Sequence, residues 1–181
     1  MVKKLGIGCG TLLLLVIVVG VLASGRAPTT VTPGGGGSPT TTSAPQQAKV
    51  GDKVSSGNWE YTVTKVEYPK TVTWSAFGNK TDAKGTWAVI YITLKNIGNR
   101  NFGIGPTDFQ LTESGGVRYD ADIFTGLSVA DFQKLSKLSS GEQYPPGVEV
   151  KTLMLFEINP AATGLKLVLR QANDTTIDLG K

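Results

Sequence analysis

The residues best suited to chemistry in this chain are two aromatic side chains in a polar stretch. Trp74 and Phe77 lie in the Gly-containing segment from Lys70 to Lys84, between two apolar segments. Aromatic side chains on such a loop could stack on sugar rings or anchor a protein partner, since tryptophan and tyrosine dominate binding hot spots. The alternative is that both rings fold back onto the domain edge and serve packing only. We take Trp74 and Phe77 as the candidate ligand-contact residues.

The composition removes most catalytic mechanisms. The chain contains no histidine, which excludes Ser-His-Asp and Cys-His catalysis and histidine-based zinc sites. The sequence also lacks a G-x-x-x-x-G-K-[ST] phosphate loop and a Ser-x-x-Lys motif. A hydrolase that uses only carboxylates is the remaining enzymatic alternative, although no motif favours it. We therefore expect no catalytic residues and no cofactor.

A metal site is a further possibility that the acidic residues raise. Asp108, Asp120 and Asp122 could lie near one another and supply the oxygen ligands that Ca²⁺ prefers. Their spacing lacks the D-x-[DN]-x-[DN]-G form of a calcium loop. Because Asp120 and Asp122 alternate with apolar residues beside Arg118, we interpret them as the solvated face of a strand and expect no metal site.

The start of the chain predicts a membrane segment. Lys3 and Lys4 lie in a short basic end, residues 1–4, and an uncharged apolar run follows over residues 5–25. At 1.5 Å per residue a helix of this run spans about 30 Å, the thickness of a bilayer core. The preceding lysines predict a cytoplasmic N-terminus and an extracytoplasmic domain. A cleaved signal peptide, with residues 21–23 near the cleavage site, is the alternative and would lead to secretion.

A flexible linker is predicted between this segment and the folded domain. Residues 26–47 are rich in Pro, Thr, Gly and Ser, and Val31 is their only β-branched aliphatic residue. Such a segment cannot bury enough apolar surface to offset chain entropy. As a coil it spans about 25 Å, and fully extended about 70 Å. The linker would hold a domain of residues 48–181 away from the membrane surface.

The charge balance argues against a nucleic-acid partner. The formal net charge of the chain is +4. Lys3, Lys4 and Arg26 precede residue 48 and no acidic residue does, so the domain itself is close to neutral. No run of basic residues interleaved with aromatics is present. The only cysteine is Cys9, so the domain cannot contain a disulfide and depends on its hydrophobic core.

The domain has the period-two pattern of strands. Residues 58–68 place Trp59, Tyr61 and Val63 on one face, and residues 86–96 are apolar on both faces, as expected for a central strand. Asn96 ends this strand before Ile97-Gly98 and is expected to hydrogen-bond local backbone. Further strands are predicted at 109–112, 117–123, 148–158, 165–170 and 175–179, the first two forming a hairpin.

One helix is predicted to interrupt the strands. Ser128 is a plausible N-cap with Asp131 at the third helical position, and Leu127 and Phe132 have the spacing of a hydrophobic staple. Phe132, Leu135 and Leu138 would then form an apolar stripe facing the sheets. This pattern predicts a mainly β fold, an antiparallel β-sandwich with one short helix.

Four segments in order resemble one bacterial family. They are Val50-Gly51-Asp52 at the start, Val89 to Gly98 ending in Asn-x-Gly, Asp108 to Leu111, and Pro146-Gly147 followed by Phe156-Glu157-Ile158. Together they resemble a bacterial extracellular domain-of-unknown-function family, immunoglobulin-like and similar to the mycobacterial immunoprotective extracellular antigen. The resemblance covers the whole exported domain. It implies an immunoglobulin-like sandwich, and it brings no established activity or catalytic residues.

These observations lead to one leading function and two alternatives. The leading hypothesis is a non-enzymatic extracytoplasmic binding or interaction module, held at the cell membrane through residues 5–25, whose partner is a cell-envelope protein or glycan. A structural envelope protein that acts by homotypic contacts is the first alternative. A carboxylate-dependent hydrolase is the second. The oligomeric state does not follow from the sequence.

Overall fold

The computed structural model describes residues 47–171 and 174–181. In chain order its elements are β1 (Ala48–Lys49), β2 (Lys53–Ser56), β3 (Trp59–Glu67), β4 (Thr71–Thr73), β5 (Lys80–Asp82), β6 (Thr86–Asn96), β7 (Phe102–Gly103), a 3₁₀ helix (Pro106–Asp108), β8 (Phe109–Thr112), β9 (Arg118–Asp120), α1 (Ile123–Phe132), β10 (Gln143–Tyr144), β11 (Glu149–Ile158), β12 (Lys166–Leu169) and β13 (Thr175–Asp178).

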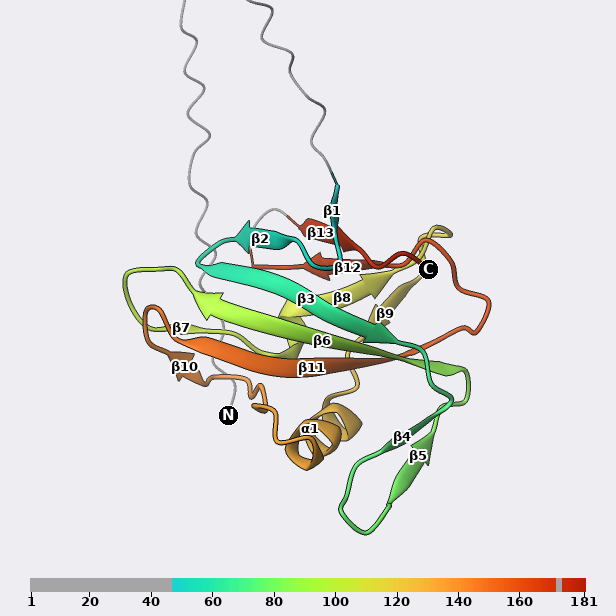
Figure 1. Cartoon of the computed structure of the whole chain (residues 1–181). Coiled ribbons are helices and arrows are strands. Elements are labelled where there is room, and N and C mark those ends of the chain that lie inside the picture. Colours follow the sequence, from blue (N-terminus) through green and yellow to red (C-terminus); the bar gives the residue numbers. More distant parts are fainter. Residues whose placement is uncertain (1–46, 172–173) are drawn as a thin grey trace, which may run out of the picture. The chain divides into compact units, whose positions relative to one another are not determined.

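Two sheets form the layers of a β-sandwich (Figure 1). One sheet has the order β1-β13-β12-β8-β9 and the other the order β11-β6-β3-β2. The pairing is antiparallel except between β1 and β13, which run parallel. The strands β4 and β5 form a separate hairpin, and β7 pairs with β10. The prediction of a mainly β sandwich with one short helix is therefore confirmed for the described residues.

The predicted membrane segment and nearly all of the linker lie outside the described residues. These are residues 5–25 and 26–46. In the part of the chain that the structure covers, no helix is both long enough and apolar enough to cross a bilayer. The anchor, its orientation and the linker therefore remain predictions from sequence.

The core between the two sheets is built from the alternating residues that the sequence singles out. Trp59, Tyr61 and Val63 of β3 are at most 1% exposed. Strand β6 lies between β11 and β3, and both of its faces are covered, as predicted. The ring of Tyr61 meets that of Phe109 from the facing sheet edge-to-face, with centroids 6.1 Å apart. Alternate side chains of these long segments therefore face the interior, because a strand directs successive side chains to opposite faces.

A second hydrophobic cluster lies on the outer face of the β11-β6-β3-β2 sheet. The sheet contributes Trp87, Val89, Leu153 and Leu155 to it, and α1 and the β4–β5 hairpin lie over them. Figure 1 shows α1 and the hairpin on the same side of this sheet, opposite the layer of β8, β12 and β13. Both faces of β6 are apolar because each face has its own cover.

The predicted start of the helix is wrong. Helix α1 begins earlier, with Asp122 as its N-cap, and the Asp122 side chain accepts a hydrogen bond from the Thr125 amide at 2.8 Å. Ser128, the predicted cap, lies inside the helix and its hydroxyl donates to the Phe124 carbonyl. Asp122 is therefore a half-buried helix cap and not part of the solvated face of a strand, because its carboxylate accepts the capping hydrogen bond.

The predicted apolar stripe is also wrong, since the helix ends at Phe132. Lys134 has a φ of 58° and leaves the helical region. Phe132 is 40% exposed, and Leu138, only 1% exposed, lies in the segment after the helix. The i, i+3 spacing indicated a helix, whereas Leu135 and Leu138 contact the core from irregular backbone.

The predicted hairpin at 109–123 is confirmed, with a shorter second strand. Strand β9 covers only Arg118–Asp120 and pairs with β8. The strand stops there because Asp122 begins the helix. The segment from Lys70 to Lys84, in contrast, contains the β4–β5 hairpin, although its polar, Gly-containing sequence predicted a loop.

Candidate functional site

The strongest candidate site lies between the β4–β5 hairpin and α1. Two hollows open there, and Phe132 lines both of them. We call the two hollows together the hairpin–helix cleft. The elements that form it are distant in sequence, and the outer face of the sheet forms part of its floor. It lies over the second hydrophobic cluster, so its walls are held by packing.

The first hollow has a volume of about 480 Å³ and a mixed lining. Val72, Val89 and Val129 supply its apolar surface. Polar side chains from β3, β4, β6 and the C-terminal end of α1 surround this surface: Glu67, Thr71, Thr73, Tyr91 and Gln133. The hollow therefore offers hydrogen-bond donors and acceptors around an apolar floor, which is typical of ligand sites.

The charged and phenolic groups of this hollow interact with one another. The Lys65 ammonium lies 2.7 Å from Glu67 and 5.4 Å from the ring centroid of Tyr91. The hydrogen bond from Lys65 lowers the pKa of the Glu67 carboxyl. Burial, followed by the Glu67 charge, raises the pKa of the Tyr91 phenol, so this hydroxyl keeps its proton at neutral pH. The Tyr91 hydroxyl is hydrogen-bonded to Glu67 and to Gln133, so Glu67 is a carboxylate acceptor that Lys65 and Tyr91 hold in place.

The second hollow contains both predicted ligand-contact residues. Its volume is about 460 Å³, and Trp74 and Phe77 line it together with Phe132. The Phe77 side chain is 95% exposed, whereas Trp74 is partly buried and packs against the second cluster. The structure therefore brings the two residues to one hollow but gives them different roles in it. Neither of the two sequence alternatives describes both rings.

One further residue of this site was missed from the sequence. Phe132, assigned to the apolar stripe that faces the sheets, instead lines both hollows of the cleft. The error came from the misplaced helix start, because it changed which face of the helix was predicted to be buried. An Asp N-cap at Asp122 followed by Thr125 was the signal that could have corrected it.

A polar clamp fixes the base of the hairpin. The Lys70 ammonium donates to the carbonyl oxygens of Ala83, Lys84 (3.0 Å) and Gly85 (2.9 Å). From β11, Glu157 accepts from the amides of Lys84 and of Gly85, the latter at 3.3 Å. The carbonyl oxygens of the turn at residues 83–85 are thus bound by Lys70, and two of its amides are bound by Glu157. The clamp joins the hairpin to the sheet and thereby holds one wall of the cleft.

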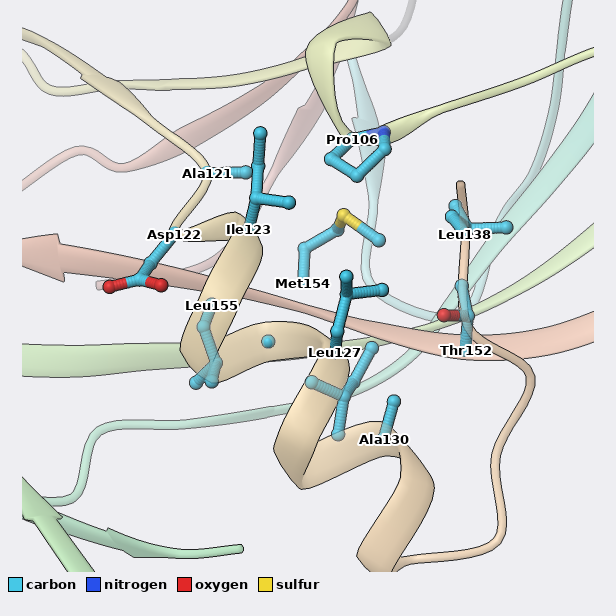
Figure 2. Close-up of a pocket in the computed structure, with 12 residues that line it drawn as sticks. Pro106, Ala121, Asp122, Ile123, Leu127, Ala130, Leu138, Thr152, Met154 and Leu155 are labelled. Carbon is cyan, nitrogen blue, oxygen red and sulfur yellow. The ribbon is translucent and has the colours of Figure 1, made fainter. Parts of the chain in front are cut away.

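A smaller cavity lies beneath α1 and is shown in Figure 2. Its volume is about 10 Å³, which is at the lower limit for one water molecule. Leu127, Leu138 and Met154 line it, and the Asp122 carboxylate points away from it. The Thr152 hydroxyl beside it is buried and has no hydrogen-bond partner among the described residues. The cavity is too small for an organic ligand, and we interpret it as a packing defect.

The three aspartates considered for calcium are each used in the fold. Asp108 accepts from the Gly105 amide at 2.7 Å, Asp120 from the Gln110 side-chain amide at 3.0 Å, and Asp122 caps α1. Among residues 47–171 and 174–181, no group of three or more acidic or cysteine side chains is placed to hold a metal ion.

One curated relative supports a bacterial origin for the domain without giving it a function. The chain is 30% identical over 116 residues to an uncharacterized protein, YxkC, of Bacillus subtilis (strain 168). The match covers 62% of this chain and 63% of that protein, so the chain spans just under two thirds of its relative.

Solved structures show the same fold. A conserved hypothetical protein from Bacillus anthracis matches with a TM-score of 0.57 at 15% identity, over 71% of this chain and 94% of that one. The secreted protein MPT63 from Mycobacterium tuberculosis matches with a TM-score of 0.52 at 11% identity, over 77% of this chain and 100% of that one. At these identities the likeness concerns the fold alone. Membership is decided by the sequence match: the chain belongs to the family described as Domain of unknown function (DUF4352), which matches residues 48–176.

Proposed function

We propose that this protein is an exported, membrane-anchored β-sandwich module that binds a component of the cell envelope and catalyses no reaction. The observation that carries the proposal is the Phe77 side chain, 95% exposed at the rim of a hollow that Trp74 and Phe132 also line. Several aromatic side chains around one concave surface are characteristic of an interaction site.

The predicted linker would let the cleft reach envelope material away from the membrane surface. The expected anchor, residues 5–25, and linker precede β1, which belongs to the β1-β13-β12-β8-β9 sheet. Helix α1 and the β4–β5 hairpin, which border the cleft, cover the outer face of the other sheet (Figure 1). A linker of about 70 Å maximal reach raises the effective concentration of the cleft near the envelope.

The electrostatics of the cleft do not favour the hydrolase alternative. A general acid needs a carboxyl group whose pKa is raised toward neutrality. The pKa of the cleft carboxyl group Glu67 is shifted in the other direction, because Lys65 hydrogen-bonds to it. A carboxylate of this kind can accept hydrogen bonds from a ligand.

The proposal is tested by retention on isolated envelope material, separated into wall polysaccharide and membrane protein. The soluble domain, residues 43–181, is a compact unit that contains both hydrophobic clusters, so it can be used without the anchor. The variant is Phe77→Ala, because Trp74 also packs in the second cluster and its loss would disturb the fold. The matched control is Phe124→Ala, which removes a similarly exposed ring, 87% exposed, that lines neither hollow.

We expect the wild type and Phe124→Ala to be retained on one fraction and Phe77→Ala to be lost from it. Equal retention of all three would place the binding surface elsewhere. Absence of retention on both fractions would overturn the binding function and favour the structural alternative.

A further inference from the structure

We propose that the hairpin–helix cleft binds a short, uncharged oligosaccharide. This inference rests on the proposed binding function and specifies its ligand. It follows from the shape of the cleft, its polar groups, its aromatic rings and its charge.

The shape favours a small ligand chain over a protein surface. The hollows, of about 480 Å³ and 460 Å³, lie within the range of about 300–1,000 Å³ usual for small-molecule sites. A stable protein interface needs about 800 Å² from each partner. Because Phe132 lines both hollows, a chain of sugar rings can continue from one hollow to the other.

The polar groups match those of a sugar. A sugar hydroxyl both donates and accepts, so its site needs both functions. The Tyr91 hydroxyl is hydrogen-bonded to Glu67 and Gln133, which leaves acceptor lone pairs on Glu67 and a second amide N–H on Gln133 for a ligand. On the hairpin side Thr73 adds a hydroxyl group, and the Thr71 hydroxyl, which donates to Asp82 at 2.5 Å, can still accept. These five side chains border an apolar floor, and a pyranose ring has the complementary arrangement, with apolar C–H faces and a hydroxyl rim.

The aromatic rings supply stacking surfaces. Phe132 lies between the hollows, and Phe77 and Trp74 line the second one. A ring face covers the C–H face of a sugar and removes apolar surface from water. The exposed Phe77 ring would be covered in this way when a ligand is bound.

The charges of the cleft are largely paired, which favours an uncharged ligand. Glu67 pairs with Lys65 at 2.7 Å, and Asp131 pairs with Lys137 at 3.3 Å. Lys134 adds one further positive charge to the second hollow. A site for an anionic lipid surface would be expected to contain a cluster of unpaired basic residues. The cleft instead offers neutral hydrogen-bonding groups beside aromatic rings.

The chain contains a built-in reporter for the test. Trp59 and Trp87 are 0% and 2% exposed, and Trp74 is the one partly exposed tryptophan of the three in the chain. A ligand in the cleft should therefore change the part of the emission that acrylamide can quench. The soluble domain, residues 43–181, is titrated with chitotetraose, cellotetraose and maltotetraose up to about 10 mM, the weak end of measurable affinity.

We expect at least one tetrasaccharide to bind and to protect Trp74 from quenching. Phe77→Ala should weaken that binding by roughly three- to tenfold through lost stacking. Tyr91→Phe, which keeps the ring but removes the hydroxyl that holds Glu67 and Gln133 in place, should weaken it about fivefold. Phe124→Ala should bind as the wild type does, and circular dichroism should show all variants folded.

Two results would overturn the saccharide proposal. One is that none of the three tetrasaccharides binds. The result counts in the same way if the probes for the other ligand classes, a Thr/Val pentapeptide or anionic phosphatidylglycerol vesicles, protect Trp74 from quenching instead. The other is that every variant binds the sugar equally. If saccharides fail while envelope retention still depends on Phe77, only the ligand assignment is wrong. If envelope retention also fails, the binding function is wrong as well.

Discussion

Asn96 is the residue whose replacement should most clearly reveal how the loops at one end of the sandwich are held. Its side chain is fully buried at the end of β6. Its amide group donates to the carbonyl oxygens of Arg100 (3.0 Å) and Tyr144 (2.7 Å), and its carbonyl accepts from the Gly98 amide at 2.9 Å. One side chain therefore joins the turn after β6 to strand β10. The perturbation is Asn96→Ala.

The magnitude follows from these three contacts. Each hydrogen bond contributes about 1 kcal/mol net, and a buried backbone group left without a partner costs about 1–3 kcal/mol. We expect Asn96→Ala to lower the free energy of unfolding by about 3–5 kcal/mol, a large part of the 5–15 kcal/mol typical of a domain. Because Asn96 holds the Tyr144 backbone, the edge-to-face contact of Tyr144 with Trp59, at 5.8 Å, should loosen too.

The assay is urea unfolding of residues 43–181 followed by far-ultraviolet circular dichroism, with near-ultraviolet dichroism to report the packing of Trp59 and Tyr144. The control is Asn99→Ala, an exposed asparagine in the same turn, which should change stability by less than about 0.5 kcal/mol. A loss below about 1 kcal/mol in Asn96→Ala would refute the reasoning, because the three contacts could not then be holding the loops.

The isosteric change Asn96→Asp adds a pH signature. A carboxylate at this position would face the two carbonyl oxygens that now accept from the amide, so burial and repulsion should raise its pKa in the folded state. A group whose pKa is raised on folding stabilises below its unfolded pKa, about 4, and that stability is lost as pH rises. Asn96→Asp should thus come closer to the wild type at pH 4 than at pH 7, while Asn96→Ala should not.

Three further predictions concern single buried residues. Gly126→Ala should stabilise α1 by about 0.5–1 kcal/mol in urea unfolding, because alanine favours helix and the added methyl would lie 4.0 Å from Leu155; destabilisation would mean that α1 packs closer to β11. Thr152→Val should raise the melting temperature, since it removes a buried hydroxyl with no partner in the described part of the chain. Burial, and then the charge of Asp108, raises the pKa of the Tyr61 phenol, so its contribution to stability is lost as pH rises above about 10. Tyr61→Phe should leave stability at pH 7 unchanged or higher and should weaken the loss measured by unfolding above pH 10.

The sequence predicted the strands of the sandwich well, because their signal is local. The alternation in residues 58–68 and 86–96 and the Glu113–Gly116 turn correspond to β3, β6 and the β8–β9 hairpin. The helix was misplaced because both Asp122 and Ser128 are good N-caps. Only the capping hydrogen bond to Thr125 shows which of them is used.

The sequence by itself determined the β-sandwich class, the lack of histidine chemistry and the choice of Trp74 and Phe77 as candidates. These follow from residue types and from a period of two, which depend on neighbours in the chain. Only the tertiary structure decided that α1 and the β4–β5 hairpin face one another across a cleft, and that Phe132 belongs to it. The cleft depends on packing between segments far apart in the sequence, and no local pattern records the distance between them.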